Sequence, residues 1–100
     1  IFQPHLYTRT RDFYKEFAES LSLLDEVILT DIYPAREEPI QGVTSRLIYD
    51  NLNAGVKKTL CRKEAVPEQV RRSDAHVFIL LGAGDIETYA PQITEILKER

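Results

Sequence analysis

Short apolar runs alternate with segments of helical periodicity along the whole of this 100-residue chain. The apolar runs predict strands at residues 1–3, 26–32, 58–62 and 76–81, and each run is followed by a helix-like segment. Strands that alternate with helices form βα units, because a helix is the usual crossover between parallel strands. This alternation predicts an α/β fold with a mainly parallel sheet.

The helices are expected at residues 10–23, 45–52, 67–73 and 91–100. In the first of them, apolar residues recur every three or four positions, which predicts one buried stripe. The stripe comprises Phe13, Phe17, Leu21 and Leu24. Helices on both faces of the sheet would make a small Rossmann-like domain of three layers. The run HVFILL at residues 76–81 predicts a fully buried strand within it.

One domain, residues 1–100, suits a chain of this length and ordinary composition. The net charge of −3 provides no basic surface for nucleic acid or a membrane. Cys61 is the only cysteine, so a disulfide within the chain is excluded and a zinc cluster is not expected. No apolar run is long enough to span a bilayer, so we expect a cytoplasmic protein. The apolar, β-prone start at Ile1 indicates a strand that is truncated, and hence a piece of a longer chain.

Three loops follow predicted strands: residues 5–10, 33–44 and 82–85. In open parallel sheets, ligands bind outside the carboxyl ends of the strands. We therefore expect any site to be formed by these three loops.

The first loop holds the densest group of chemically capable side chains, with His5, Tyr7, Thr8 and Arg9 in close succession. A guanidinium can bind a carboxylate or phosphate through two hydrogen bonds, and an imidazole beside it can donate another. The start of the following helix would add free N–H groups. The residues alone leave two readings equally open: a site for a small anion, or a helix start capped by Thr8 or Thr10 and followed by a solvated face.

The third loop, GAGDI at residues 82–86, is a weak match to the dinucleotide fingerprint, because it lacks the third glycine and follows the last strand. A tight turn in which Gly82 or Gly84 permits close backbone approach is the favoured reading, with Asp85 as a cap. Asp31, at the end of the second strand, could orient a ligand or cap a turn, and Tyr33 follows it. We expect residues 35–38 to be solvated.

The segment FQPHLYTRT at residues 2–10 closely resembles the F-Q-P-H-x-Y-[ST]-R-T signature of the alanine-adding Mur ligases. Residues 31–40, DIYPAREEPI, are similar to the D-x-Y-x-A-x-E-x-P-I loop of that family, and residues 82–86 to its G-A-G-D-I turn. The three motifs occur in the family's order and cover nearly the whole chain. They identify it as similar to the C-terminal domain of these three-domain enzymes of peptidoglycan synthesis.

The resemblance implies an ATP-dependent, amide-forming ligase that joins L-alanine to UDP-N-acetylmuramate through an acyl phosphate. His5 and Arg9 match the residues expected to bind the alanine carboxylate, and Tyr7 would line the same pocket. Thr8, Asp31, Tyr33, Gly82, Gly84 and Asp85 are secondary candidates. Leu6 departs from the family pattern, which often has arginine there, so one cationic contact is missing or comes from elsewhere.

The resemblance also implies that ATP and magnesium bind mainly in the central domain, so we expect no cofactor, no metal and no activity in this piece alone. Its partners would be the N-terminal and central domains of the same chain, with no nucleic acid or membrane. Two alternatives remain. One is the domain of a recycling ligase that adds a preformed peptide to the same sugar. The other is a non-catalytic Rossmann-like module that binds a nucleotide.

Overall fold

The computed structural model describes residues 1–100 and contains a small parallel sheet at its centre. Strand β1, Glu26–Leu29, pairs in parallel with β2, Lys57–Leu60, with Glu26 opposite Lys57 and Leu29 opposite Leu60. Both strands end at the same edge, which places the loops that follow them side by side.

Two further extended segments continue the sheet beyond β1. Phe2 forms parallel bridges to Leu29 on one side and to Leu81 on the other. The Phe2 N–H donates to the Ile28 carbonyl at 2.8 Å, and the Gln3 N–H donates to the Leu81 carbonyl at 2.9 Å. The order across the sheet is therefore β2, β1, residues 1–3 and residues 79–81, all parallel.

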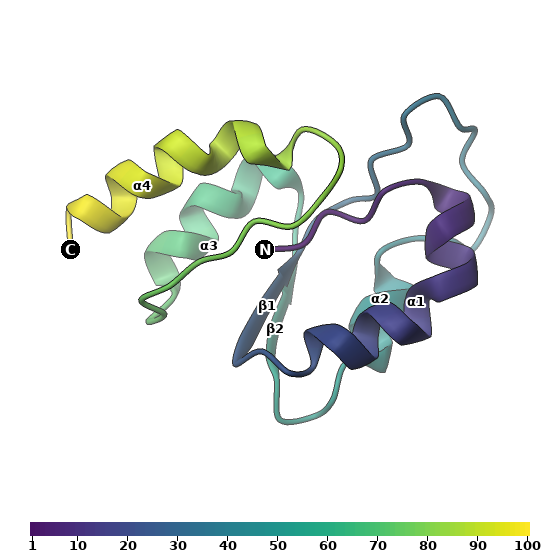
Figure 1. Cartoon of the computed structure of the whole chain (residues 1–100), viewed down its shortest axis with the longest axis horizontal. Coiled ribbons are helices and arrows are strands. Elements are labelled where there is room, and N and C mark those ends of the chain that lie inside the picture. Colours follow the sequence, from purple (N-terminus) through teal and green to yellow (C-terminus); the bar gives the residue numbers. More distant parts are fainter.

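Helices cover both faces of this sheet (Figure 1). On one side α1, Tyr7–Leu21, packs against α2, Arg46–Asn51, and on the other α3, Val66–Arg72, packs against α4, Ala90–Lys98. The three predicted layers are thus present, and the α/β fold with a parallel sheet is confirmed.

The side chains of β1 enter two separate hydrophobic cores, because successive residues of a strand point to opposite faces. Val27 and Leu29 lie in the core formed with α1 and α2, whereas Ile28 lies in the core formed with α3 and α4. This two-sided burial makes β1 the centre of the domain and fixes the position of the loop that follows it.

The predicted helices are found, with shifted ends. The largest shift is in α1, which begins at Tyr7 and not at residue 10. Thr8 and Thr10 therefore lie inside the helix, and the prediction that one of them caps it is wrong. The Thr10 hydroxyl donates to the Leu6 carbonyl at 2.9 Å. The predicted burial of Phe13 is also wrong, since its side chain is 50% exposed.

The strands are shorter than predicted, because β1 and β2 pair over only four residues each. Beyond β1 only the pairing with the N-terminal segment continues, as the Thr30 N–H donates to the Phe2 carbonyl at 3.0 Å. Ser45 precedes α2 as expected, but its hydroxyl donates to the Thr30 carbonyl at 2.5 Å and not to the helix.

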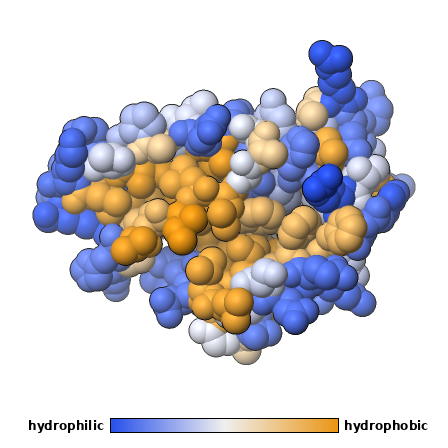
Figure 2. Space-filling model, in the orientation of Figure 1, coloured by the Kyte–Doolittle hydropathy of each residue, from blue (hydrophilic) through white to orange (hydrophobic).

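The prediction of a fully buried strand at residues 76–81 is wrong. Phe78 and Leu80 pack against the core, but Val77 and Ile79 are 79% and 53% exposed. Residues 79–81 form the edge row of the sheet, and no helix covers the outward face of this row. An apolar groove of about 110 Å³ lies beside it, lined mainly by hydrophobic side chains that include Ile1 and Val77. Figure 2 shows a broad hydrophobic area on this side of the molecule.

None of the helices is both long and apolar enough to span a bilayer.

Candidate functional site

The loops after β1 and after the N-terminal segment meet at the carboxyl edge of the sheet. His5 forms a parallel bridge with Tyr33, and the two rings stack with centroids 6.1 Å apart and planes inclined by 18°. The Leu6 N–H donates to the Tyr33 carbonyl at 2.9 Å, and the Tyr33 N–H donates to the Pro4 carbonyl at 2.8 Å. Backbone pairing therefore places His5 beside Tyr33, and the stacking of the two rings orients the imidazole.

The third loop packs beneath the ring of Tyr33. A Cβ atom added at Gly84 would overlap Cγ of Tyr33 and lie only 2.7 Å from Oε1 of Gln3. Gly82 is also crowded, with the Gln3 carbonyl oxygen 3.1 Å from such an atom. Neither glycine has a positive φ, so both are required for close approach. This geometry agrees with the favoured reading of GAGDI as a tight, closely packed turn.

Gln3 ties this turn to the sheet. Its side chain is almost fully buried, donates from Nε2 to Oδ1 of Asp85 at 2.8 Å, and accepts the Ile86 N–H at 3.1 Å. Asp85 also forms an ion pair of 2.5 Å with Lys63. The hydrogen bond from Gln3, followed by the one from Lys63, holds the pKa of Asp85 below its usual range. The prediction of Asp85 as a side-chain cap is wrong, because its carboxylate is directed to Gln3 and Lys63.

Tyr7 and Asp31 share a second cavity, of about 280 Å³. Its other lining residues are Ile32, Thr44 and Ser45, so the wall combines the start of α1, the end of β1 and the approach to α2. Three of the five lining residues, Asp31, Thr44 and Ser45, have polar side chains. The structure thus brings two of the predicted site residues, Tyr7 and Asp31, to one hollow.

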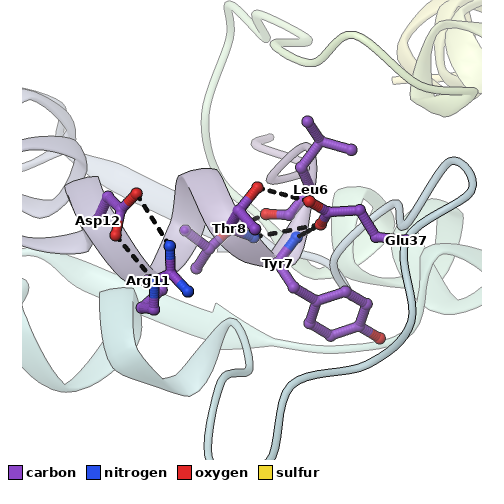
Figure 3. A network of polar contacts seen from close by, with 7 residues as sticks. Leu6, Tyr7, Thr8, Arg11, Asp12 and Glu37 are labelled. Atoms are coloured by element: carbon purple, nitrogen blue, oxygen red, sulfur yellow. Dashed lines mark hydrogen bonds and ion pairs between the residues drawn. The ribbon is translucent and has the colours of Figure 1, made fainter.

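The N-terminus of α1 is filled by a carboxylate of the protein itself. Oε1 of Glu37 accepts the N–H groups of Tyr7 at 2.5 Å and of Thr8 at 3.2 Å, while Oε2 accepts the Thr8 hydroxyl at 2.5 Å. Figure 3 shows Glu37 reaching this helix start from its own loop. The expectation that residues 35–38 are solvated is therefore wrong for Glu37, and the N–H groups of Tyr7 and Thr8 are not free.

The cationic side chains near this helix start have different surroundings. Arg9 is exposed, which leaves its guanidinium accessible. Arg11 pairs with the neighbouring Asp12 at 2.8 Å, about one turn further along α1 than Thr8, which binds Glu37 (Figure 3). Of the two, only Arg9 offers a guanidinium without an ion pair in the chain. Arg9 and His5 therefore form no ion pair within the chain, and neither of them is among the residues that line the cavity.

The contacts of Glu37 predict how stability changes with pH. The hydrogen bond from the Thr8 hydroxyl, and then those from the backbone N–H groups, hold the pKa of Glu37 below its usual range. A lowered folded-state pKa stabilises the fold above the unfolded value of about 4.3, and this stabilisation is lost as the pH falls through the folded value.

Glu37→Gln should therefore lower Tm at neutral pH, and the difference from the wild type should shrink on acidification toward about pH 3. Thermal unfolding across this range measures it. Glu38→Gln, at an exposed neighbour, is the matched control and should leave Tm unchanged at both ends. A constant difference for Glu37→Gln would contradict the role of its charge.

Three residues of this region were not identified from the sequence: Gln3, Glu37 and Lys63. Gln3 stands at the predicted end of a strand, and an amide there, just before Pro4, is only a weak signal for a buried polar contact. Glu37 is the glutamate of the D-x-Y-x-A-x-E-x-P-I pattern, which marks the residue but not its contact with α1, 29 to 30 residues away. Lys63 carries no such signal, and its partner lies 22 residues away in the chain.

Donors for a metal ion are not grouped in this domain. No three His, Cys, Asp or Glu residues lie close enough together to hold one. Two carboxylates of the loops already have partners: Asp85 is paired with Lys63, and Glu37 with the start of α1. The residues of this chain therefore do not fit a magnesium site of their own.

Comparison with known proteins gives consistent relatives. No family model matches the chain. It is 63% identical over 100 residues to the UDP-N-acetylmuramate–L-alanine ligase of Phocaeicola vulgatus, and 57% over 97 residues to that of Parabacteroides distasonis. The matches cover 100% and 97% of the chain but only 22% and 21% of the relatives, so the chain spans about a fifth of their length. The resemblance seen in the three motifs is therefore confirmed: along its whole length, the chain is homologous to one part of the UDP-N-acetylmuramate–L-alanine ligases.

Proposed function

We propose that the chain is the C-terminal domain of an ATP-dependent ligase that joins L-alanine to UDP-N-acetylmuramate in peptidoglycan synthesis, in the bacterial cytoplasm. Its role would be to bind the incoming amino acid and to close over the reaction centre. The observation that carries the proposal is the convergence of the three motif loops at one edge of the sheet, where His5 stacks on Tyr33 and Tyr33 covers Gly84.

In this proposal His5 and Arg9 bind the carboxylate of alanine. A guanidinium and an imidazole are suited to this task, because both donate hydrogen bonds to carboxylate oxygens. Tyr7 lines a cavity together with Asp31. With the carboxylate held at one end, the amine of alanine is free to attack the activated muramoyl carboxyl group. Phosphate leaves from the same carbon, and the amide bond forms.

Closure of the domain would supply the rest of its contribution. A fixed orientation of the nucleophile removes most of the entropic cost of the encounter. Exclusion of water protects an acyl phosphate from hydrolysis. In the full enzyme, ATP would supply the phosphoryl group and magnesium would neutralise the charge of the phosphates. We assign both to the rest of the ligase, since the donors of this chain do not form a metal site.

The full-length protein that carries this chain tests the proposal. It should release phosphate from ATP when UDP-N-acetylmuramate and L-alanine are both present, and much less when alanine is replaced by the tripeptide of peptidoglycan. Turnover with the tripeptide but not with alanine, in the presence of the UDP-sugar, would overturn the proposal in favour of a recycling ligase. Omitting the UDP-sugar is the control for uncoupled ATP hydrolysis.

A nucleotide-binding module is less well supported by the geometry. A dinucleotide would need to approach the backbone of the glycine turn, but Tyr33 and Gln3 cover Gly84. Titration of the chain with NAD, ATP and UDP-sugars separates the two functions. We expect no tight binding, and micromolar or tighter affinity for a dinucleotide would favour the module instead.

A further inference from the structure

Glu37 joins two of the three loops at the candidate site. It comes from the loop between Tyr33 and Thr44, yet its carboxylate binds the first residues of α1 through the N–H groups of Tyr7 and Thr8 and the hydroxyl of Thr8. All three donors converge on the same two oxygens. The contact spans about 30 residues of chain, so it fixes tertiary structure and is not a local cap.

The helix needs this contact because its own sequence supplies no cap. Leu6 occupies the N-cap position with φ of 71°, and no side chain of the preceding segment accepts a helix N–H group. The first N–H groups of a helix lack partners within it, and a carboxylate stabilises both these donors and the helix dipole. Glu37 therefore fills the position that an anion would otherwise take at this helix start.

Two consequences follow for a bound amino acid. First, its carboxylate is excluded from the helix start and must be bound by side chains, which leaves His5 and Arg9. Second, the Glu37 contact sets where the first turn of α1 lies relative to β1. That first turn carries both Tyr7, which lines the cavity with Asp31, and Arg9, two residues further along.

We infer that Glu37 is a positioning residue for the ligase reaction: by holding the first turn of α1, it places Tyr7 and Arg9 for the incoming amino acid. The inference rests on the proposed function. Glu37 does not itself contact substrate, since its oxygens are occupied by Tyr7 and Thr8. We expect it to act on the binding of the amino acid, because its contacts are confined to the first turn of α1, which carries Tyr7 and Arg9.

The full-length ligase with Glu37→Gln is the test, with Glu38→Gln as the matched control of equal charge change. We expect Glu37→Gln to raise the KM for alanine by roughly tenfold, as small displacements of binding groups can cost this much or more. The KM for ATP should stay within about twofold of the wild-type value, as should both constants in Glu38→Gln. A variant that is merely less stable would lose kcat through a smaller folded fraction and keep its KM. That outcome would overturn the inference.

Hydrogen exchange provides a readout that does not depend on activity. The amides of Tyr7 and Thr8 should exchange faster in Glu37→Gln than in the wild type or in Glu38→Gln, because their acceptor is weakened. Unchanged protection of these two amides would also overturn the inference. If the wild-type enzyme turns over alanine but Glu37→Gln behaves as Glu38→Gln, the positioning role fails and the proposed function stands. If the wild type uses only the tripeptide, the proposed function fails. The role of Glu37 is then tested by the effect of Glu37→Gln on the KM for the tripeptide and on the exchange rates of the Tyr7 and Thr8 amides.

Discussion

Replacing Gly84 with alanine is expected to destabilise the domain by about 1–3 kcal/mol, the usual cost of overpacking a filled interior. The added methyl group would overlap Cγ of Tyr33 and lie 2.8 Å from its Cδ1 and 2.7 Å from Oε1 of Gln3. Neither neighbour can yield easily. The Tyr33 backbone is paired with the Pro4–Leu6 segment, and Gln3 is fixed by Asp85 and Ile86. For a domain of this size, Tm should fall by roughly 5–20 °C.

Gly55→Ala is the matched control, because a Cβ atom there meets nothing within 4 Å and its φ is not positive. It should change stability by no more than about 0.5 kcal/mol. Thermal unfolding of the purified chain, followed by far-ultraviolet circular dichroism, compares the two variants. Equal Tm values for Gly84→Ala and Gly55→Ala would show that Tyr33 does not pack on this turn. The described packing of the three loops against one another would then be wrong.

Arg9→Ala in the full-length ligase is expected to lower kcat/KM for alanine by at least about tenfold, or roughly 1.4 kcal/mol of transition-state stabilisation. The reason is the loss of a guanidinium that is exposed, free of an ion pair and carried by the first turn of α1, next to the loops of the candidate site. Arg9→Lys should give an intermediate value, because it keeps the charge but loses the planar pair of donors.

Arg36→Ala makes the same change of charge on the neighbouring exposed loop and serves as the control. Steady-state kinetics with alanine as the varied substrate distinguish the variants. If Arg9→Ala and Arg36→Ala were equally close to the wild type, Arg9 would not belong to the binding site, and the carboxylate would need another cation.

The layers of the fold could be predicted because they depend on periodicity, which each segment carries in its own residues. Val27, Ile28 and Leu29 are buried on both faces, as an apolar strand between helices requires. The same reasoning failed at residues 76–81, because an apolar run does not reveal whether a helix covers it. The edge position of Val77 and Ile79 follows from the order of the strands, which no single segment encodes.

The site was predictable as a set of loops but not as a set of contacts. Strand ends located His5, Asp31 and Gly84 at one edge, and the structure places the loops there. The start of α1 was misplaced by three residues because its acceptor, Glu37, lies about 30 residues further along the chain. The buried contact of Gln3 with Asp85 spans 82 residues and was equally invisible to local pattern.

The central claim is that this chain works as the amino-acid-binding domain of an alanine ligase, and a domain exchange tests it most directly. The matching segment of the Phocaeicola vulgatus ligase, 63% identical to this chain, would be replaced by residues 1–100. We predict that the chimera ligates L-alanine to UDP-N-acetylmuramate, and that Arg9→Ala within it lowers kcat/KM as above. A chimera that folds and binds ATP as tightly as the parent ligase but does not ligate alanine would contradict the claim.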